Sequence, residues 1–217
     1  MSEMKDAFFA QAESGFSALS AEDREFQNSF RHWDDGRQKL SVRYQKEQYT
    51  IDPLTRLKAL IAGERLLGWI RDVKEAHDLA TREALPAKVD QEVFEVAICL
   101  PRSGYADNLQ SFRAYCQARG YRLLTLHEGI DVLEEVRRSK INMNDALFPL
   151  IIGGNTEVVI PKEQFFDDES HTGTILFNGF MSENQPAATF SLLPDDFPFA
   201  AMDGPQPCFL ITSLNKK

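Results

Sequence analysis

An arginine, a hydroxyl group and a glycine directly follow the first long apolar run in the second half of the chain. They are Arg102, Ser103 and Gly104, and the run that precedes them is 93–100. In an open α/β sheet, ligands gather at the carboxyl ends of strands, where the N–H groups of the next helix favour anions. This turn could therefore hold a phosphate or a carboxylate. The alternative is that Ser103 and Gly104 only turn the chain and cap the helix, with Arg102 in solvent.

Three further residues could complete such an anion site. His127 follows the second apolar run, at a predicted strand end where acid and base residues occur, although a turn or helix-capping role would place it there too. Gly153 and Gly154 follow the third apolar run. If the three runs form parallel strands, both glycines would share a sheet edge with Arg102 and would let a ligand approach the backbone. The sequence contains no GxGxxG motif and no P-loop lysine motif.

Acidic residues and phenylalanines are interleaved in the C-terminal part of the chain. Residues 157–217 hold nine acidic residues against three lysines. Aromatic side chains anchor protein interfaces and acids attract basic partners, so this pattern predicts a partner-binding surface. The alternative is a loop that places its phenylalanines in the core. The predicted partner-binding residues are Phe165, Phe166, Asp167, Asp168, Asp195 and Asp196.

These candidates would be positioned by a small α/β domain over residues 89–217. Three apolar runs alternate with two segments of helical period, which is typical of a β-α-β-α-β unit of the three-layer type, with helices covering a parallel sheet. Short runs separated by proline and glycine then predict a strand-rich, acidic C-terminal segment. The expected parallel strands are 93–100, 121–126 and 147–152, and the later strands are 174–180, 188–193 and 208–213.

Residues 1–88 are expected to form a helical hairpin or bundle that packs on this domain. Apolar residues recur at helical spacing, and Asp52-Pro53 combines a helix cap with a favoured first helical residue. Pro86 ends the helical pattern and precedes the first strand. The fold class is therefore mixed α and β. The expected helices are 3–17, 21–48 and 53–84.

Composition narrows the classes of partner and compartment. The net charge is −9, and residues 89–217 hold 18 acidic against 10 basic residues. Nucleic acid contact is not expected from this half, because phosphate binding needs clustered cations. No run approaches the roughly 18 apolar residues of a membrane span, and we expect no membrane partner. The three cysteines show no metal-type spacing, so we expect buried free thiols, no metal or cofactor, and a reducing cytoplasmic location.

Two functions follow as hypotheses. The first is a non-enzymatic cytoplasmic adaptor, either a subunit of a larger assembly or a neutraliser of a partner with a basic surface. The absence of a catalytic motif and the uneven acidity favour it. The second is a small enzyme or sensor that binds a phosphate- or carboxylate-bearing ligand at the turn after the first strand. Convergence of Arg102, Ser103 and His127 in one pocket would favour the second.

Overall fold

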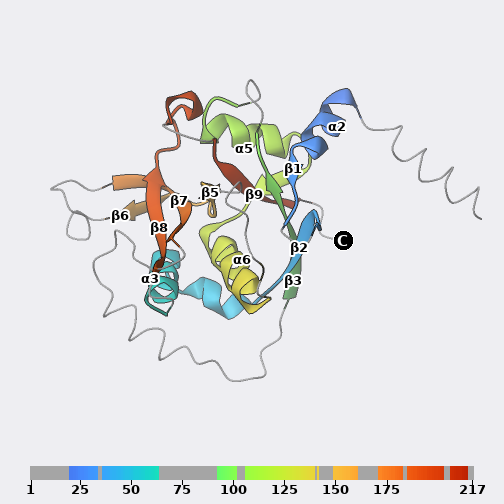
Figure 1. Cartoon of the computed structure of the whole chain (residues 1–217). Coiled ribbons are helices and arrows are strands. Elements are labelled where there is room, and N and C mark those ends of the chain that lie inside the picture. Colours follow the sequence, from blue (N-terminus) through green and yellow to red (C-terminus); the bar gives the residue numbers. More distant parts are fainter. Residues whose placement is uncertain are drawn as a thin grey trace, which may run out of the picture.

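The structure is a computed structural model, and it combines four α-helices with a mostly antiparallel sheet in its described residues (Figure 1). It describes residues 20–33, 36–63, 92–101, 106–139, 141, 149–160, 171–182, 185–202 and 206–214. The α-helices are α2 (Ala21–Asn28), α3 (Pro53–Gly63), α5 (Leu109–Gln117) and α6 (Leu126–Arg138). Two 3₁₀ helices are η1 (Lys46–Thr50) and η4 (Phe199–Ala201). No helix within these ranges is both long enough and apolar enough to cross a membrane.

Nine strands of the described residues form the sheet, in the order β1-β3-β9-β5-β7-β6, with β2 beside β3, β4 beside β9 and β8 beside β7. In this part of the chain, the pairing of β5 with β9 is the single parallel one. The strands are β1 (Phe30–Arg31), β2 (Lys39–Tyr44), β3 (Glu92–Cys99), β4 (Tyr121–Leu123), β5 (Leu150–Ile151), β6 (Val158–Ile160), β7 (His171–Ser182), β8 (Gln185–Leu193) and β9 (Cys208–Ser213).

Successive residues of β3 face two different hydrophobic clusters, as the pleat of a strand requires. Val96 and Ile98 belong to the cluster that contains buried residues of α3 and α6. Ala97 and Cys99 belong to the cluster that contains buried residues of α2 and α5. Figure 1 shows α2 and α5 in the upper part of the view and α3 and α6 below them, with strands between the two pairs. The central strands are therefore buried on both faces.

The predicted helix over 21–48 is wrong beyond Asn28. After α2 the chain forms β1, β2 and η1, and both strands pair antiparallel with β3. In β2 buried and exposed residues alternate, with Leu40, Val42 and Tyr44 inside. This is the period of a strand, and the wider aromatic spacing concealed it. Gly36 adopts a φ of 81°, a left-handed conformation that a continuous helix excludes.

The prediction of three parallel strands is also wrong. Both β3 and β4 run antiparallel to β9, whereas β5 runs parallel to it. Strand β9 lies between β3 and the other two, so a distant C-terminal segment sets their directions. The strand-rich C-terminal segment itself is confirmed, because β7, β8 and β9 contain the three predicted runs.

Other predictions fall partly outside the described residues. Helix α3 begins at Pro53 as expected, but the rest of the predicted helix over 53–84, the helix over 3–17 and the boundary at 86–90 lie outside them. The division into 1–88 and 89–217 stays a prediction. The described parts of both regions share one sheet, because β1 and β2 pair with β3.

Candidate functional site

The most buried charges of the described residues lie where α3 packs on α6. Arg56 of α3 donates from Nη2 to Oδ1 of Asp131 at 2.7 Å, and the two side chains are 3% and 2% exposed. Arg56 also donates to Oε1 of Gln48 at 2.8 Å and lies 3.0 Å from Nδ1 of His127. Tyr49 donates its hydroxyl to Oδ2 of Asp131 at 2.6 Å. Both oxygens of the Asp131 carboxylate are thus bonded, as a buried charge requires.

The position of His127 follows from the capping of α6. Thr125 donates its backbone N–H to Glu128 at 2.9 Å, and the Glu128 N–H lies 3.3 Å from the Thr125 hydroxyl, which is a reciprocal capping box. The helix therefore begins at Leu126, and His127 lies in its first turn. Asp131 follows one turn later on the same helix face. The spacing Thr-x-x-Glu was a signal for this start, and the prediction of a strand over 121–126 overlooked it.

Burial and charge set the pKa values around this cluster. Burial lowers the pKa of His127, and the Arg56 guanidinium lowers it further. Burial raises the pKa of Asp131, although Arg56 and Tyr49 oppose the rise. Burial opposes ionisation of Glu128 as well, but hydrogen bonds from Arg122 and Thr125 hold its pKa below the ordinary value. Perturbed pKa values accompany catalytic sites, yet a substrate cannot reach an ion pair that is almost wholly buried. We interpret the cluster as a structural lock between α3 and α6.

A polar groove lies on the other side of the sheet from this cluster, beside α5. It is a cavity of about 450 Å³, lined by Gln110, Arg113, Glu157, Thr172, Pro194, Asp195 and Asp196. Its volume is in the range of cavities that hold small ligands or single side chains of a partner, roughly 300–1,000 Å³. The lining comes from α5, from the segments before β6 and after β8, and from the start of β7. We call it the α5 groove.

Asp195 and Asp196 have different roles in the α5 groove. Asp195 forms a two-point ion pair with Arg113 of α5 and accepts a hydrogen bond from the Thr174 hydroxyl at 3.2 Å. Arg113 also donates to the carbonyl of Gly154 at 2.5 Å, so this pair connects three segments. Asp196 is exposed, and within the described ranges neither it nor Glu157 has an ion-pair partner. Asp195 therefore holds together the segments that line the α5 groove, while the charges of Asp196 and Glu157 are available to a partner.

The structure describes three of the six residues predicted to bind an anion, His127, Gly153 and Gly154. Arg102, Ser103 and Gly104 lie outside the described residues. Cys99 and Ile151 both pair with Phe209, one antiparallel and one parallel, so β3 and β5 run in opposite directions and not in parallel as expected. A site shared by the turn after β3 with Gly153 and Gly154 stays a prediction, because that turn lies outside the described residues. His127 faces Arg56.

Gly153 and Gly154 serve close packing. A Cβ on Gly153 would lie 2.9 Å from the Cα of Leu126, and one on Gly154 would lie 2.7 Å from a methyl carbon of Leu123. Both residues are buried. The glycines therefore let the chain after β5 pass against the start of α6, and they leave no room there for a ligand.

The first N–H groups of α5 already have partners in the chain. Ser111 donates its N–H to the Asn108 side chain at 2.9 Å, and Gln110 donates its N–H to the carbonyl of Asp195 at 3.3 Å. The hydroxyl of Ser111 bonds the backbone of Asn108 in return, which completes a capping box. An anion at this helix start would have to displace these bonds.

Of the predicted partner-binding residues, the structure describes two, Asp195 and Asp196, and both line the α5 groove. Phe165, Phe166, Asp167 and Asp168 lie outside the described residues. Arg113 and Glu157 were missed, because a single arginine on a helix and a single glutamate before a strand carry no local signal.

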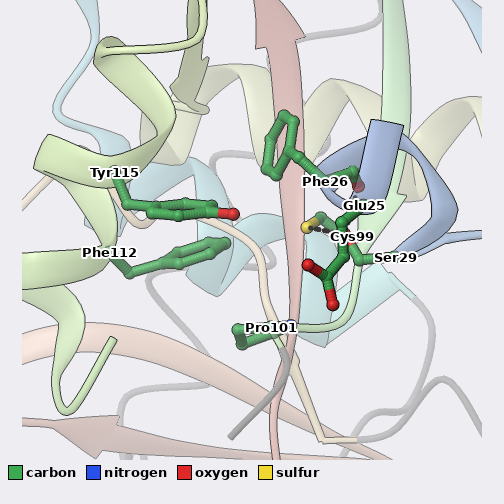
Figure 2. Close-up of a pocket in the computed structure, with 7 residues that line it drawn as sticks. All are labelled: Glu25, Phe26, Ser29, Cys99, Pro101, Phe112 and Tyr115. Carbon is green, nitrogen blue, oxygen red and sulfur yellow. Dashed lines mark hydrogen bonds between the residues drawn. The ribbon is translucent and has the colours of Figure 1, made fainter. Parts of the chain in front are cut away.

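A second, much smaller cavity lies between α2, α5 and the end of β3. Figure 2 shows Phe112 and Tyr115 side by side and the thiol of Cys99 directed at Ser29. The cavity measures about 10 Å³, about the room that one water molecule needs. The thiol of Cys99 lies 3.1 Å from the Ser29 hydroxyl. This space is too small for a substrate, and we interpret it as a packing defect.

The three thiols should be inert in the folded protein. Cys99, Cys116 and Cys208 are buried and unpaired. Burial raises the pKa of Cys99 to about 12 and that of Cys208 to about 11. Since only the thiolate attacks electrophiles, we expect iodoacetamide at about pH 8 to leave all three unmodified in the native protein and to label all three in denaturant. Mass spectrometry of intact protein checks this, and fast labelling of one cysteine in the native state would contradict its burial.

Comparisons of the chain with protein-family models, with curated proteins and with solved structures find no match. In the part of the chain that the structure describes, no group of three or more His, Cys, Asp or Glu side chains could hold a metal ion. The geometry of the described residues is therefore the basis for a functional interpretation.

Proposed function

We propose that the protein is a non-enzymatic binding subunit that holds a basic segment of another protein in the α5 groove. One observation carries the proposal: the groove combines three carboxylates with a single guanidinium, and that guanidinium is already bound to Asp195. The remaining charges of Glu157 and Asp196 would attract a lysine or arginine side chain. The bonds of Arg113 to Asp195 and to Gly154 hold one wall of the groove together, and a preformed groove has less to order when the partner binds.

The wider charge distribution supports the same class of partner. The second half of the chain is the acidic half, so its field would steer a basic protein surface toward the groove. Phe165, Phe166, Asp167 and Asp168 lie outside the described residues, and we expect them to contact the same partner. Buried unpaired thiols support a cytoplasmic location, where cysteines stay reduced.

The alternative, an enzyme or sensor for a phosphate- or carboxylate-bearing ligand, has less support. Arg102, Ser103 and Gly104 lie outside the described residues, His127 is bonded to Arg56, Gly153 and Gly154 serve close packing, and the first N–H groups of α5 are occupied. No specific observation favours it over a basic partner.

Neutralising the two available carboxylates should weaken binding of a basic probe. We expect the double variant Glu157→Gln/Asp196→Asn to bind a fluorescent hexalysine peptide roughly twofold to thirtyfold more weakly than the wild type, since two exposed ion pairs contribute about 0.4–2 kcal/mol together. Fluorescence anisotropy at about 50 and 150 mM salt measures the affinity, and added salt should weaken binding by screening.

The matched control is Glu47→Gln/Glu95→Gln, which removes the same charge from exposed positions on η1 and β3. It should bind hexalysine almost as the wild type does, and a hexaglutamate peptide should bind none of the proteins. Equal losses in the two double variants would show that only net charge matters, and the α5 groove would then not be the binding site.

A further inference from the structure

The geometry around His127 fixes its protonation state. Nδ1 of His127 lies 3.0 Å from Nη1 of Arg56, and a guanidinium has donors only. Nδ1 must therefore accept this hydrogen bond, so the ring is neutral and its proton is on Nε2. Arg56 is held in place by Asp131 and Gln48. A second proton on the imidazole would face a fixed, buried cation.

The 3₁₀ helix η1 depends on the same cluster. It has five residues, no side-chain cap and no buried residue. Its Tyr49 ring stacks on His127 with centroids 4.8 Å apart and planes at 17°, and the Tyr49 hydroxyl bonds Asp131. Gln48 accepts from Arg56. These contacts attach η1 to α6, and the Tyr49 ring also stacks on Tyr44 of β2 at 5.6 Å.

We propose that η1 and the first turn of α6 form a pH-sensitive clamp, which is closed while His127 is neutral and opens when His127 takes up a proton. In the open state the His127 ring leaves Arg56, and Tyr49 loses its stacking partner. The device is separate from the α5 groove and does not rest on the proposed function.

Asp52 and Glu128 act to raise the pKa of His127, but burial and Arg56 outweigh them. Asp52 accepts from the backbone and the hydroxyl of Thr55 at 2.8 and 3.0 Å, and Glu128 binds Arg122 through both oxygens. Asp131 is shared between Arg56 and Tyr49. The titratable and charged groups around the ring come from β2, η1, the start of α3, β4 and α6, and they are Tyr44, Tyr49, Asp52, Arg56, Arg122, Glu128 and Asp131.

The sign of the pH effect follows from His127 and Asp131, whose pKa values are shifted in opposite directions. Burial and Arg56 lower the pKa of His127 in the closed state below the ordinary value of a histidine, so acidification favours the open state. Burial raises the pKa of Asp131, so proton uptake there favours the closed state. The two effects oppose each other, and only the first depends on His127. Removing His127 while keeping Asp131 therefore isolates the clamp.

Amide hydrogen exchange of the full-length protein tests the proposal. Between about pH 7.5 and about pH 5.5, residues 46–51 of the wild type should lose protection severalfold after correction for intrinsic rates, while amides of β9 keep theirs. In His127→Gln the amide oxygen can still accept from Arg56 but carries no titrating proton, so this pH effect should be absent. His32→Gln is the matched control: His32 is exposed and bonds the carbonyl of Gly36, and the variant should behave as the wild type.

An NMR titration of the imidazole signals in the wild type keeps the test independent of how well His127→Gln folds. The loss of protection at 46–51 should follow the titration of His127. Protection that stays constant while His127 titrates would overturn the proposal. So would a pH effect of full size in a folded His127→Gln protein.

Discussion

Replacing Asp131 by alanine should lower the free energy of unfolding by about 3–5 kcal/mol, the usual cost of leaving a buried charge without its partner. Arg56 would stay in a site where its side chain is 3% exposed, with only neutral acceptors from Gln48 and His127. Tyr49 would also lose the acceptor of its hydroxyl. Urea unfolding followed by circular dichroism measures the change.

Two variants show that the loss comes from the unpaired charge. The double variant Arg56→Met/Asp131→Leu removes both charges and should lose less stability than Asp131→Ala, because apolar residues of similar size can replace a buried ion pair at little cost. Glu95→Ala removes a carboxylate that is 61% exposed and pairs with Lys39, so it should change stability by less than about 1 kcal/mol. If Asp131→Ala is as stable as Glu95→Ala, the pair between α3 and α6 is not a structural lock.

Local signals predicted several elements correctly. The cap at Asp52-Pro53 predicted the start of α3. The C-terminal strands were predicted from short apolar runs between prolines and glycines. In each case, the residues that determine the structure lie within a few positions of one another.

Pairings between distant segments could not be read in this way. The direction of β3 relative to β5 depends on β9, which is more than fifty residues from either strand along the chain. An apolar run indicates that a strand is buried, but it does not indicate which strand pairs with it. Strand β2 is a different case: its alternation of polar and apolar residues is present in the sequence, and the wider aromatic spacing at helical intervals concealed it.

The candidate site also depends on contacts between segments that are distant along the chain. Arg113, Glu157 and Asp195 come from different segments, and their convergence depends on how the turn after β8 docks on α5. The sequence indicated the acidity of this part and predicted Asp195 and Asp196 as partner-binding residues. The sequence could not show that Arg113 neutralises Asp195 and leaves the charge of Asp196 available.

Gly129→Ala should be the most damaging single-methyl change in the described part of α6. In an ordinary helix this substitution stabilises by up to about 1 kcal/mol, because alanine is the better helix former. Here a Cβ on Gly129 would lie 2.6 Å from the carbonyl carbon of Ile152 and closer still to its oxygen. Both atoms belong to the backbone, so relief requires that α6 and the turn after β5 move apart.

We therefore expect Gly129→Ala to lose at least about 3 kcal/mol, the upper part of the range for overpacking, or to leave no folded protein. The comparison variant is Gly120→Ala, where a Cβ would meet nothing within 4 Å and only the positive φ is strained, at a cost of about 1 kcal/mol. Urea unfolding gives both values. Movement of α6 would also disturb the packing of Leu126 against Gly153. The loss of stability should therefore affect the whole fold, and unfolding should remain cooperative. A Gly129→Ala protein as stable as the wild type would mean that α6 lies farther from Ile152 than described, and the packing assigned to Gly153 would fail with it.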